Sequence, residues 1–323
     1  MEKIIEGICT HKWNIAFSFV FHRKREGERK DMKIIDAHNH PDYYGHNLEK
    51  FLENMDANGI SQTWLLNWEC GAGEALPHYT HVMPGAVFGS KYGPVPFERC
   101  LSFKERAPER FILGYAPDPR TPEASARLEH AHDTYGAQVC GEVKVRMMYD
   151  DREALRLFRT AGRLKMPVTL HLQDEVGDRD GKWQEWWGGD IDTLERVLQM
   201  CPETIFLGHA LTFWIHISGD DIYRTSGYPP VPCPVVPGGR LIELLRKYPN
   251  LHCDISAGSG CNALKRDPVF AMEFLDEFQD RILYARDYFD SIHRAFLDSL
   301  NLPLEIQEKI YHGNAERLLA EYK

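Results

Sequence analysis

Closely spaced cysteine pairs are missing from the sequence, and their absence excludes two common roles for cysteine. The 8 cysteines are scattered, with neither a C-x-x-C pair nor the tight framework of small secreted domains. A redox motif and a disulfide scaffold are therefore both excluded. We expect reduced thiols in a cytoplasmic protein.

The chain also lacks an excess of positive charge. Its formal net charge is -10, and no run of Lys and Arg interleaved with aromatic residues occurs in the body of the chain. Such a charge balance does not suit a surface that neutralises many phosphates, so we expect no nucleic-acid partner. A small-molecule substrate is the expected partner.

Long apolar runs are absent as well. The short run at residues 15–21 cannot span a bilayer, and its basic residues follow it, whereas those of a signal peptide come first. We therefore expect no membrane association. We interpret residues 1–32 as an N-terminal extension outside the folded domain. Our hypothesis is that Met32 is the natural start, because the first convincing strand begins immediately after it.

Short apolar or β-branched runs alternate with amphipathic stretches from residue 33 onward, as they do in repeated βα units. In the predicted helix at residues 151–164, for example, Ala154, Phe158 and Ala161 fall on one face. The predicted strands are residues 33–38, 62–66, 111–116, 139–145, 167–171, 204–207, 250–255 and 281–285.

Eight strand–helix units are the number that closes a (β/α)₈ TIM barrel, an α/β fold whose reactive side is the rim at the carboxyl ends of the strands. The chain has 323 residues, 43% of them apolar, which is enough to bury such a core. We predict one barrel domain over residues 33–323. An open doubly wound sheet is the alternative, but no glycine-rich phosphate fingerprint follows the first strand.

Two connections, residues 172–189 and 210–239, are too long to be simple joints, and each follows a strand that ends in histidine. Long loops at the catalytic rim usually shape the substrate pocket, so Trp214 is a candidate substrate-binding residue. Loop aromatics such as Trp187 also anchor loops or bury subunit interfaces. A homodimer is therefore one interpretation.

Histidines and one carboxylate end several predicted strands. His38 and His40 are two residues apart on the first strand, so their side chains point the same way and offer two imidazoles to one metal. An H-x-H pair alone describes ordinary loop histidines equally well. His171 ends the fifth strand, His209 the sixth and Asp287 the eighth. Together, four histidines and a carboxylate on one rim favour a metal site.

This constellation resembles the amidohydrolase superfamily. Residues 310–319, I-Y-H-G-N-A-E-R-L-L, are similar to the Y-G-N-A-x-R-L-L ending of the amidohydrolase-related branch, with His312 as one extra residue. The resemblance covers residues 32 to the C-terminus. It implies either hydrolysis of carboxylic-acid, lactone or amide substrates or non-oxidative decarboxylation, since the branch contains enzymes of both kinds.

The resemblance further implies that His38, His40, His171 and Asp287 bind the ion, usually zinc, and that His209 lies beside it as a catalytic group. Imidazoles and one carboxylate suit Zn²⁺, and a coordination position left to water lowers the pKa of that water. Asp287 would also accept the proton of the attacking water, while His209 polarises the bond or holds the oxyanion. Manganese, iron and cobalt fit the same ligands.

The fourth strand adds an ambiguity, because its period of two places Glu142, Lys144 and Arg146 on one face. Three charges inside a barrel are costly without partners. The superfamily offers two precedents, a carboxylated Lys144 that bridges two metals or a Glu142 that binds or bridges them. Either makes the site binuclear, with His171 and His209 on the second ion. We favour one ion, because many members of the branch look mononuclear.

A structural interpretation of the same strand is that Glu142 and Lys144 pair with each other or with Asp36. Lys144 and Arg146 are candidate substrate-binding residues. Arg146 would pair with a substrate carboxylate, because arginine binds carboxylates through two parallel hydrogen bonds. Arg286 should point to the opposite face of its strand from Asp287 and form a structural ion pair.

The function that we predict is hydrolysis of a C–N or C–O bond in a small carboxylated or aromatic compound by a metal-activated water. Metal-dependent non-oxidative decarboxylation is the alternative, and a strand-four carboxylate beside the metal favours hydrolysis. A TatD-type nuclease shares H-x-H and a strand-four glutamate, but the acidic charge balance argues against it. An inactive binding barrel is the fourth interpretation, although such relics usually lose ligands.

Overall fold

The computed structural model describes residues 32–75, 79, 81–88, 93–177, 184–223 and 228–320. The chain divides into two units, Met1–Met32 and Lys33–Lys323, and the second contains the helices and strands described below. The expected N-terminal extension therefore lies outside the described residues apart from Met32, and the hypothesis that Met32 is the natural start stays a prediction.

Eight parallel strands form the centre of this unit, in two hydrogen-bonded sheets. All eight coincide with predicted strands, with bounds that differ by one to three residues at most ends. The first sheet has the order β1 (Ile35–Asn39), β2 (Gln62–Leu65), β3 (Phe111–Leu113). The second has the order β10 (Ile282–Leu283), β9 (Leu251–Asp254), β8 (Phe206–His209), β5 (Val168–His171), β4 (Cys140–Val143).

Backbone hydrogen bonds also join the edges of the two sheets. At the β3–β4 seam, Tyr115 N donates to Val139 O at 2.9 Å. At the β10–β1 seam, Ala37 N donates to Tyr284 O at 2.9 Å and Asp287 N donates to His38 O at 2.8 Å. The eight strands thus follow one another around a ring, which is the arrangement of a TIM barrel.

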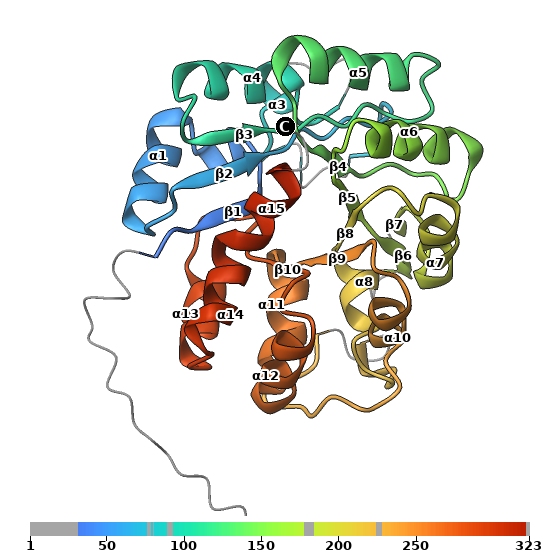
Figure 1. Cartoon of the computed structure of the whole chain (residues 1–323). Coiled ribbons are helices and arrows are strands. Elements are labelled where there is room, and N and C mark those ends of the chain that lie inside the picture. The colour runs from blue at the N-terminus through green and yellow to red at the C-terminus, as the bar shows by residue number, and fades with distance from the viewer. Residues whose placement is uncertain are drawn as a thin grey trace, which may run out of the picture. The chain divides into compact units, whose positions relative to one another are not determined.

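Helices surround the strands (Figure 1). In α6, the buried residues Ala154, Leu155, Phe158 and Ala161 line one face, as the sequence pattern predicts. None of the helices in the described residues is both long and apolar enough to cross a membrane. Their bounds are α1 Leu48–Ala57, α3 Gly85–Phe88, α4 Phe97–Arg106, α5 Ala124–Tyr135, α6 Arg152–Arg163, α7 Ile191–Met200, α8 Leu211–Ile215, α10 Arg240–Lys247, α11 Ala257–Lys265, α12 Pro268–Glu277, α13 Ile292–Ser299, α14 Leu304–Glu308 and α15 Asn314–Ala320.

Secondary structure occurs in the described residues of both long connections. Within the first, β6 (Gln173–Gly177) pairs antiparallel with β7 (Gln184–Trp187), so a hairpin stands where the sequence analysis expected a loop. Trp187 at the end of this hairpin is fully buried. The second connection begins with α8, which buries Trp214.

The C-terminal helix packs on the barrel core. Ala315, Leu318 and Leu319 of α15 belong to one apolar cluster with strand residues from around the ring, among them Ile35 and Leu207. Figure 1 shows α15 beside β1 and β10. The residues that carry the N-A-x-R-L-L ending therefore contribute directly to the core.

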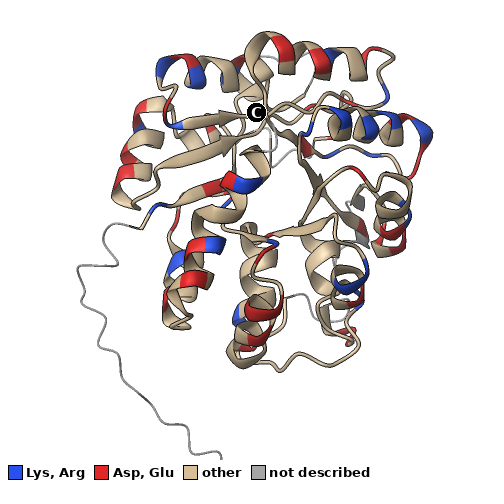
Figure 2. Cartoon of the chain, in the orientation of Figure 1, with Lys and Arg blue, Asp and Glu red and all other residues tan. Residues whose placement is uncertain are grey.

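Charged residues lie mainly on the outer helices, where acidic and basic side chains are interspersed (Figure 2). One exception is a buried ion pair at the β10–β1 seam, where Arg286 Nε lies 2.8 Å from Asp36 Oδ2 and both residues are fully buried. Arg286 also donates its backbone N–H to Asp36 Oδ1 and Nη1 to Asn54 Oδ1, each at 2.9 Å. Arg286 thus forms the structural ion pair expected from the sequence.

Replacement of Arg286 by Met should destabilise the barrel strongly, because Asp36 would remain as a buried carboxylate without its counter-ion. The expected loss in the free energy of unfolding is about 3 to 5 kcal/mol, measured by urea denaturation. The control is Arg246→Met, which breaks a pair with Glu277 whose side chains are 62% and 43% exposed. An exposed pair contributes about 1 kcal/mol or less. Equal losses in the two variants would contradict the structural role of Arg286.

Candidate metal centre

Seven polar side chains meet at the carboxyl ends of the strands, on the face where TIM barrels carry their active sites. Six of them are buried, and Asp287 is the most accessible, with 18% of its side chain exposed. Each comes from the end of a strand or from the residues that follow it. The seven are His38 and His40 (β1), Glu142 (β4), His171 (β5), His209 (β8), Asp254 (β9) and Asp287 (after β10).

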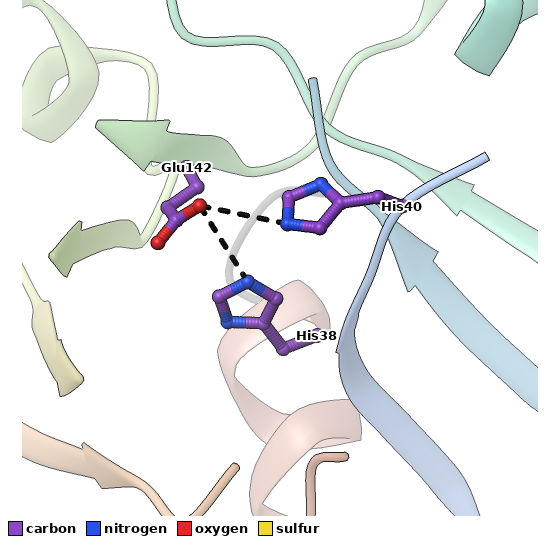
Figure 3. A group of neighbouring side chains, drawn as sticks. All are labelled: His38, His40 and Glu142. Atoms are coloured by element: carbon purple, nitrogen blue, oxygen red, sulfur yellow. Dashed lines mark ion pairs between the residues drawn. The ribbon is translucent and has the colours of Figure 1, made fainter. Parts of the chain in front are cut away.

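Glu142 lies between two pairs of imidazoles. Its Oε2 atom is 3.5 Å from His40 Nε2 and 3.9 Å from His38 Nε2 (Figure 3). Its Oε1 atom is 2.7 Å from His171 Nδ1 and 3.7 Å from His209 Nε2. The strand-four glutamate, whose role the sequence left open, therefore lies at the middle of the cluster.

Asp287 approaches the same two histidines from the opposite edge of the ring. Its Oδ1 atom is 3.5 Å from His40 Nε2 and 3.9 Å from His38 Nε2, and its Oδ2 atom is 3.9 Å from His209 Nε2. The backbone of Asp287 has φ 49°, a left-handed conformation that costs a residue other than glycine about 1 to 3 kcal/mol. The hydrogen bond from Asp287 N to His38 O, described above, holds this conformation in place.

The hydrogen bonds made by the Nδ1 atoms of His38 and His40 determine which nitrogen of each ring can bind a metal. His38 Nδ1 lies 2.6 Å from Asp254 Oδ2, and His40 Nδ1 lies 2.9 Å from Leu66 O. Because a carbonyl oxygen and an ionised carboxylate only accept, both Nδ1 atoms donate, and the lone pair is left on each Nε2 atom. Among the described residues, the buried Nε2 atom of His38 has no hydrogen-bond partner. Both histidines therefore direct an Nε2 atom toward the centre, that of His40 beside Glu142 Oε2.

His209 differs from these two, because its Nδ1 atom faces the Ser256 hydroxyl at 2.9 Å. A hydroxyl can donate as well as accept. When Ser256 donates to Nδ1, the proton of His209 sits on Nε2 and points at Glu142 and Asp287. Burial holds the pKa of His209 well below its usual value, so the ring is neutral. This tautomer suits a hydrogen-bond donor better than a metal ligand.

His171 is the remaining predicted ligand, and like His38 it keeps a buried Nε2 atom without a hydrogen-bond partner among the described residues. Its Nδ1 atom pairs with Glu142 Oε1, and it groups with Glu142 and His209, whereas His38 and His40 group with Glu142. The Nε2 atoms of His38 and His40 lie 3.5 to 3.9 Å from Glu142 Oε2 and Asp287 Oδ1. Ligands of a tetrahedral zinc ion are about 3.4 Å apart, given bonds of about 2.1 Å. The spacing of these four residues therefore suits one such ion, and the assignment of His171 as a ligand stays a prediction.

Asp254 is a site residue that the sequence analysis missed. Besides its contact with His38, its Oδ1 atom accepts Ser256 N at 2.8 Å. Burial alone would raise the pKa of Asp254, but His38 and His209 lower it, so the carboxylate is ionised. The available signal was a carboxylate at the end of the seventh predicted strand, the same position that Asp287 occupies after the eighth.

The acidic groups dominate the electrostatics of the cluster. Burial lowers the pKa of His38, but Asp254, Asp287 and Glu142 together raise it to about 10. A buried position where three carboxylates favour a proton on imidazole also favours a bound cation. Buried ligand atoms and this negative potential both fit a divalent metal ion, which would take the place of a proton on His38 Nε2.

Lys144 lies between three aromatic rings. Its Nζ atom is 4.3 Å from the ring centroid of Trp68, 4.4 Å from that of Tyr79 and 4.8 Å from that of Trp187. Burial tends to lower the pKa of Lys144, but Tyr79 and Glu142 raise it above its usual value. Trp68 and Tyr79 are a second feature that the sequence analysis did not identify.

The structure contradicts the interpretation that Glu142 and Lys144 pair with each other or with Asp36. Asp36 pairs with Arg286, so the expectation that it pairs with Glu142 or Lys144 is wrong. Among the described residues no ion pair within 4.0 Å joins Glu142 to Lys144, and Glu142 pairs with the histidines.

Arg146 and Trp214, the other candidates for substrate binding, do not line the main cavity. The backbone N of Arg146 donates to Glu74 Oε2 at 3.1 Å. Trp214 is buried, and its Nε1 atom donates to the backbone oxygen of Asp254 at 3.1 Å. Trp214 thus supports the strand that carries Asp254.

A cavity of about 590 Å³ opens onto the cluster, large enough for a small organic molecule. Its floor includes His40, Glu142, Lys144, His209 and Asp287. Five tyrosines also line it, namely Tyr43, Tyr44, Tyr79, Tyr228 and Tyr288.

Comparisons with known proteins agree with this architecture. A family model described as Amidohydrolase matches residues 21–320. No curated protein matches the chain significantly. Among solved structures, the chain is similar to a TIM-barrel protein, Bb4693, from Bordetella bronchiseptica, with a TM-score of 0.57 and 19% identity over 90% of this chain and 99% of that one.

Two further solved structures are decarboxylases. One is 5-carboxyvanillate decarboxylase LigW from Sphingomonas paucimobilis (TM-score 0.57, 15% identity, 90% of this chain and 99% of that one). The other is 2,6-dihydroxybenzoate decarboxylase from Rhizobium (TM-score 0.53, 17% identity, 90% and 99%). At these identities the likeness shows a shared fold.

Metal content should distinguish Glu142 from His171 as a ligand. We expect Glu142→Ala to lose the divalent ion, because Glu142 Oε2 faces the free nitrogens of His38 and His40. We expect His171→Asn to retain about one ion per chain, because the asparagine amide can still donate to Glu142 Oε1. Elemental analysis of protein purified without chelators measures both. A Glu142→Ala variant with wild-type metal content contradicts this donor set.

Asp254 should hold His38 in its metal-binding orientation. Replacement by Asn is expected to weaken metal affinity about 10- to 100-fold, the usual effect of losing a carboxylate that orients a ligating histidine. Competition with a chelator of known affinity measures the change. Asp290→Asn is the matched control, since Asp290 lines the same cavity and its Oδ1 atom accepts Ile292 N. An unchanged affinity in Asp254→Asn would remove this role.

Proposed function

Because the chain belongs to the Amidohydrolase family, whose model matches residues 21–320, we propose that it is a metal-dependent hydrolase of a small molecule. The bond cleaved is C–N or C–O, in a carboxylated or aromatic compound. The observation that carries the proposal is the position of Glu142, a carboxylate in the middle of the cluster with one oxygen facing His38 and His40. Glu142 thus adds a second carboxylate to that of Asp287, the acidic group that decarboxylation and hydrolysis both need.

His38, His40, Glu142 and Asp287 would hold one divalent ion. The free Nε2 lone pairs and the carboxylate oxygens described above support this assignment, and Zn²⁺ is the ion that such a set suits best. When bound, the ion would supply Lewis-acid polarisation of a carbonyl group and activation of water.

Asp287 would act as the general base. It is the most exposed acidic group of the cluster and lines the cavity, so a substrate and a water molecule can reach its carboxylate. Burial raises the pKa of Asp287, whereas His38 and His40 lower it. It would accept the proton of the attacking water and return it to the leaving group.

His209 would stabilise the oxygen on which negative charge develops. When the Ser256 hydroxyl donates to Nδ1, the neutral ring directs an N–H group from Nε2 toward the centre. A donor that is already oriented stabilises a developing oxyanion without reorganisation, typically by a factor of about 10² to 10³ in rate.

Decarboxylation is the second candidate, because two of the solved structures with this fold are decarboxylases. The same residues would then serve a different end, with a protonated side chain of the cluster donating to carbon while CO₂ leaves. A nuclease function has less support, since acidic and basic residues are interspersed on the outer helices of the described chain (Figure 2).

Isotope incorporation separates the two reactions. We expect a panel of amides, esters, lactones and aromatic carboxylic acids, incubated in H₂¹⁸O, to yield an acid product that carries one ¹⁸O atom, without CO₂. Release of CO₂ with solvent deuterium on the product carbon in D₂O would contradict hydrolysis.

His209→Asn should keep its metal and lose at least about 100-fold in kcat. The control His130→Asn changes a histidine on the outer helix α5, away from the cluster, and should retain wild-type turnover.

A further inference from the structure

Lys144 is a buried cation that lines the cavity of the site. Only 4% of the residue is exposed, and its ammonium group donates to Tyr79 Oη at 3.3 Å. Within the described residues no carboxylate lies within 4.0 Å of its ammonium group. Glu142, two residues away, has its own contacts with the histidines.

The three rings around Lys144 lower the cost of burying it without supplying a counter-ion. The rings of Trp68, Tyr79 and Trp187 all lie within 4.8 Å of Nζ, and each face of an aromatic ring carries negative quadrupole charge. Such contacts offset part of the desolvation cost of the ammonium. An ammonium group has three donors, and the one hydrogen bond to Tyr79 leaves it able to donate to a further acceptor.

This charge faces the site. Lys144 lines the cavity of about 590 Å³ together with Glu142, His209 and Asp287. An anion in the cavity can therefore reach Nζ and complete its hydrogen bonds. A carboxylate fits better than a phosphate, because one negative charge balances one ammonium.

We propose that Lys144 is the specificity-determining residue of the site and that it binds a carboxylate of the substrate. This inference rests on the proposed function, since it names the substrate class of the same cavity.

Binding of benzoate and of its neutral isostere benzamide tests the assignment without turnover. Isothermal titration calorimetry is carried out on the full chain with its metal, and the metal content of every sample is measured. We expect the wild type to bind benzoate more tightly than benzamide. Lys144→Met should reduce this preference at least about tenfold, because it removes a charge-assisted hydrogen bond.

Lys265→Met is the matched control, since Lys265 is the other lysine that lines the cavity, and its preference should stay within about threefold of wild type. Lys144→Arg keeps the charge and should keep the preference and the metal. If Lys144→Met loses its metal, the Lys144→Arg variant tests the role of the positive charge instead.

The proposal is overturned if the wild type shows no preference for benzoate, if Lys144→Met retains it, if Lys265→Met loses it to the same extent, or if metal-loaded Lys144→Arg loses it. A wild type that prefers benzoate but incorporates no ¹⁸O from water into any product would instead overturn hydrolysis and leave the role of Lys144 intact.

Discussion

Closure of the ring between the last strand and the first is the constraint on which the site depends. Asp36 and Arg286 make the buried ion pair at this seam. His38 lies two residues after Asp36 and Asp287 directly follows Arg286, so each partner of the ion pair has a neighbour in the metal cluster. The same seam holds Asp287 N against His38 O. A strained backbone at Asp287 persists there because both neighbours are fixed. The same contacts thus determine the stability of the barrel and the positions of the metal ligands.

The histidines of the cluster have different roles, because the Nδ1 atom of each ring has a different hydrogen-bond partner. His38 and His40 donate outward to oxygen acceptors and keep a lone pair for a metal, whereas His209 faces a hydroxyl and can keep a proton on the inner nitrogen. The carboxylates divide similarly, since Asp254 orients His38 from behind while Glu142 and Asp287 face the centre. Partner identity, more than residue type, determines each role.

The sequence predicted the barrel and most of the cluster because both follow from local patterns. Strand periodicity placed His38, His40, His171, His209 and Asp287 at one rim, and the structure brings all five there. The sequence could not show which of these residues bind the metal. That depends on which oxygen of Glu142 faces which imidazole, and so on how separate strands pack around the ring. Asp254 was overlooked for the same reason. The partners of Lys144 come from three separate segments, and no local pattern connects Trp68, Tyr79 and Trp187.

The ion pair at the seam joins residues 250 positions apart in the chain. During synthesis at about 5 to 20 residues per second, Asp36 must wait roughly 10 to 50 s before Arg286 exists. Throughout that interval β1 has one edge without its neighbour, and such an edge can pair with other chains. The last helix, α15, which completes the apolar cluster, emerges later still. The N-terminal half of this barrel is therefore the segment that most needs protection while the protein is being made.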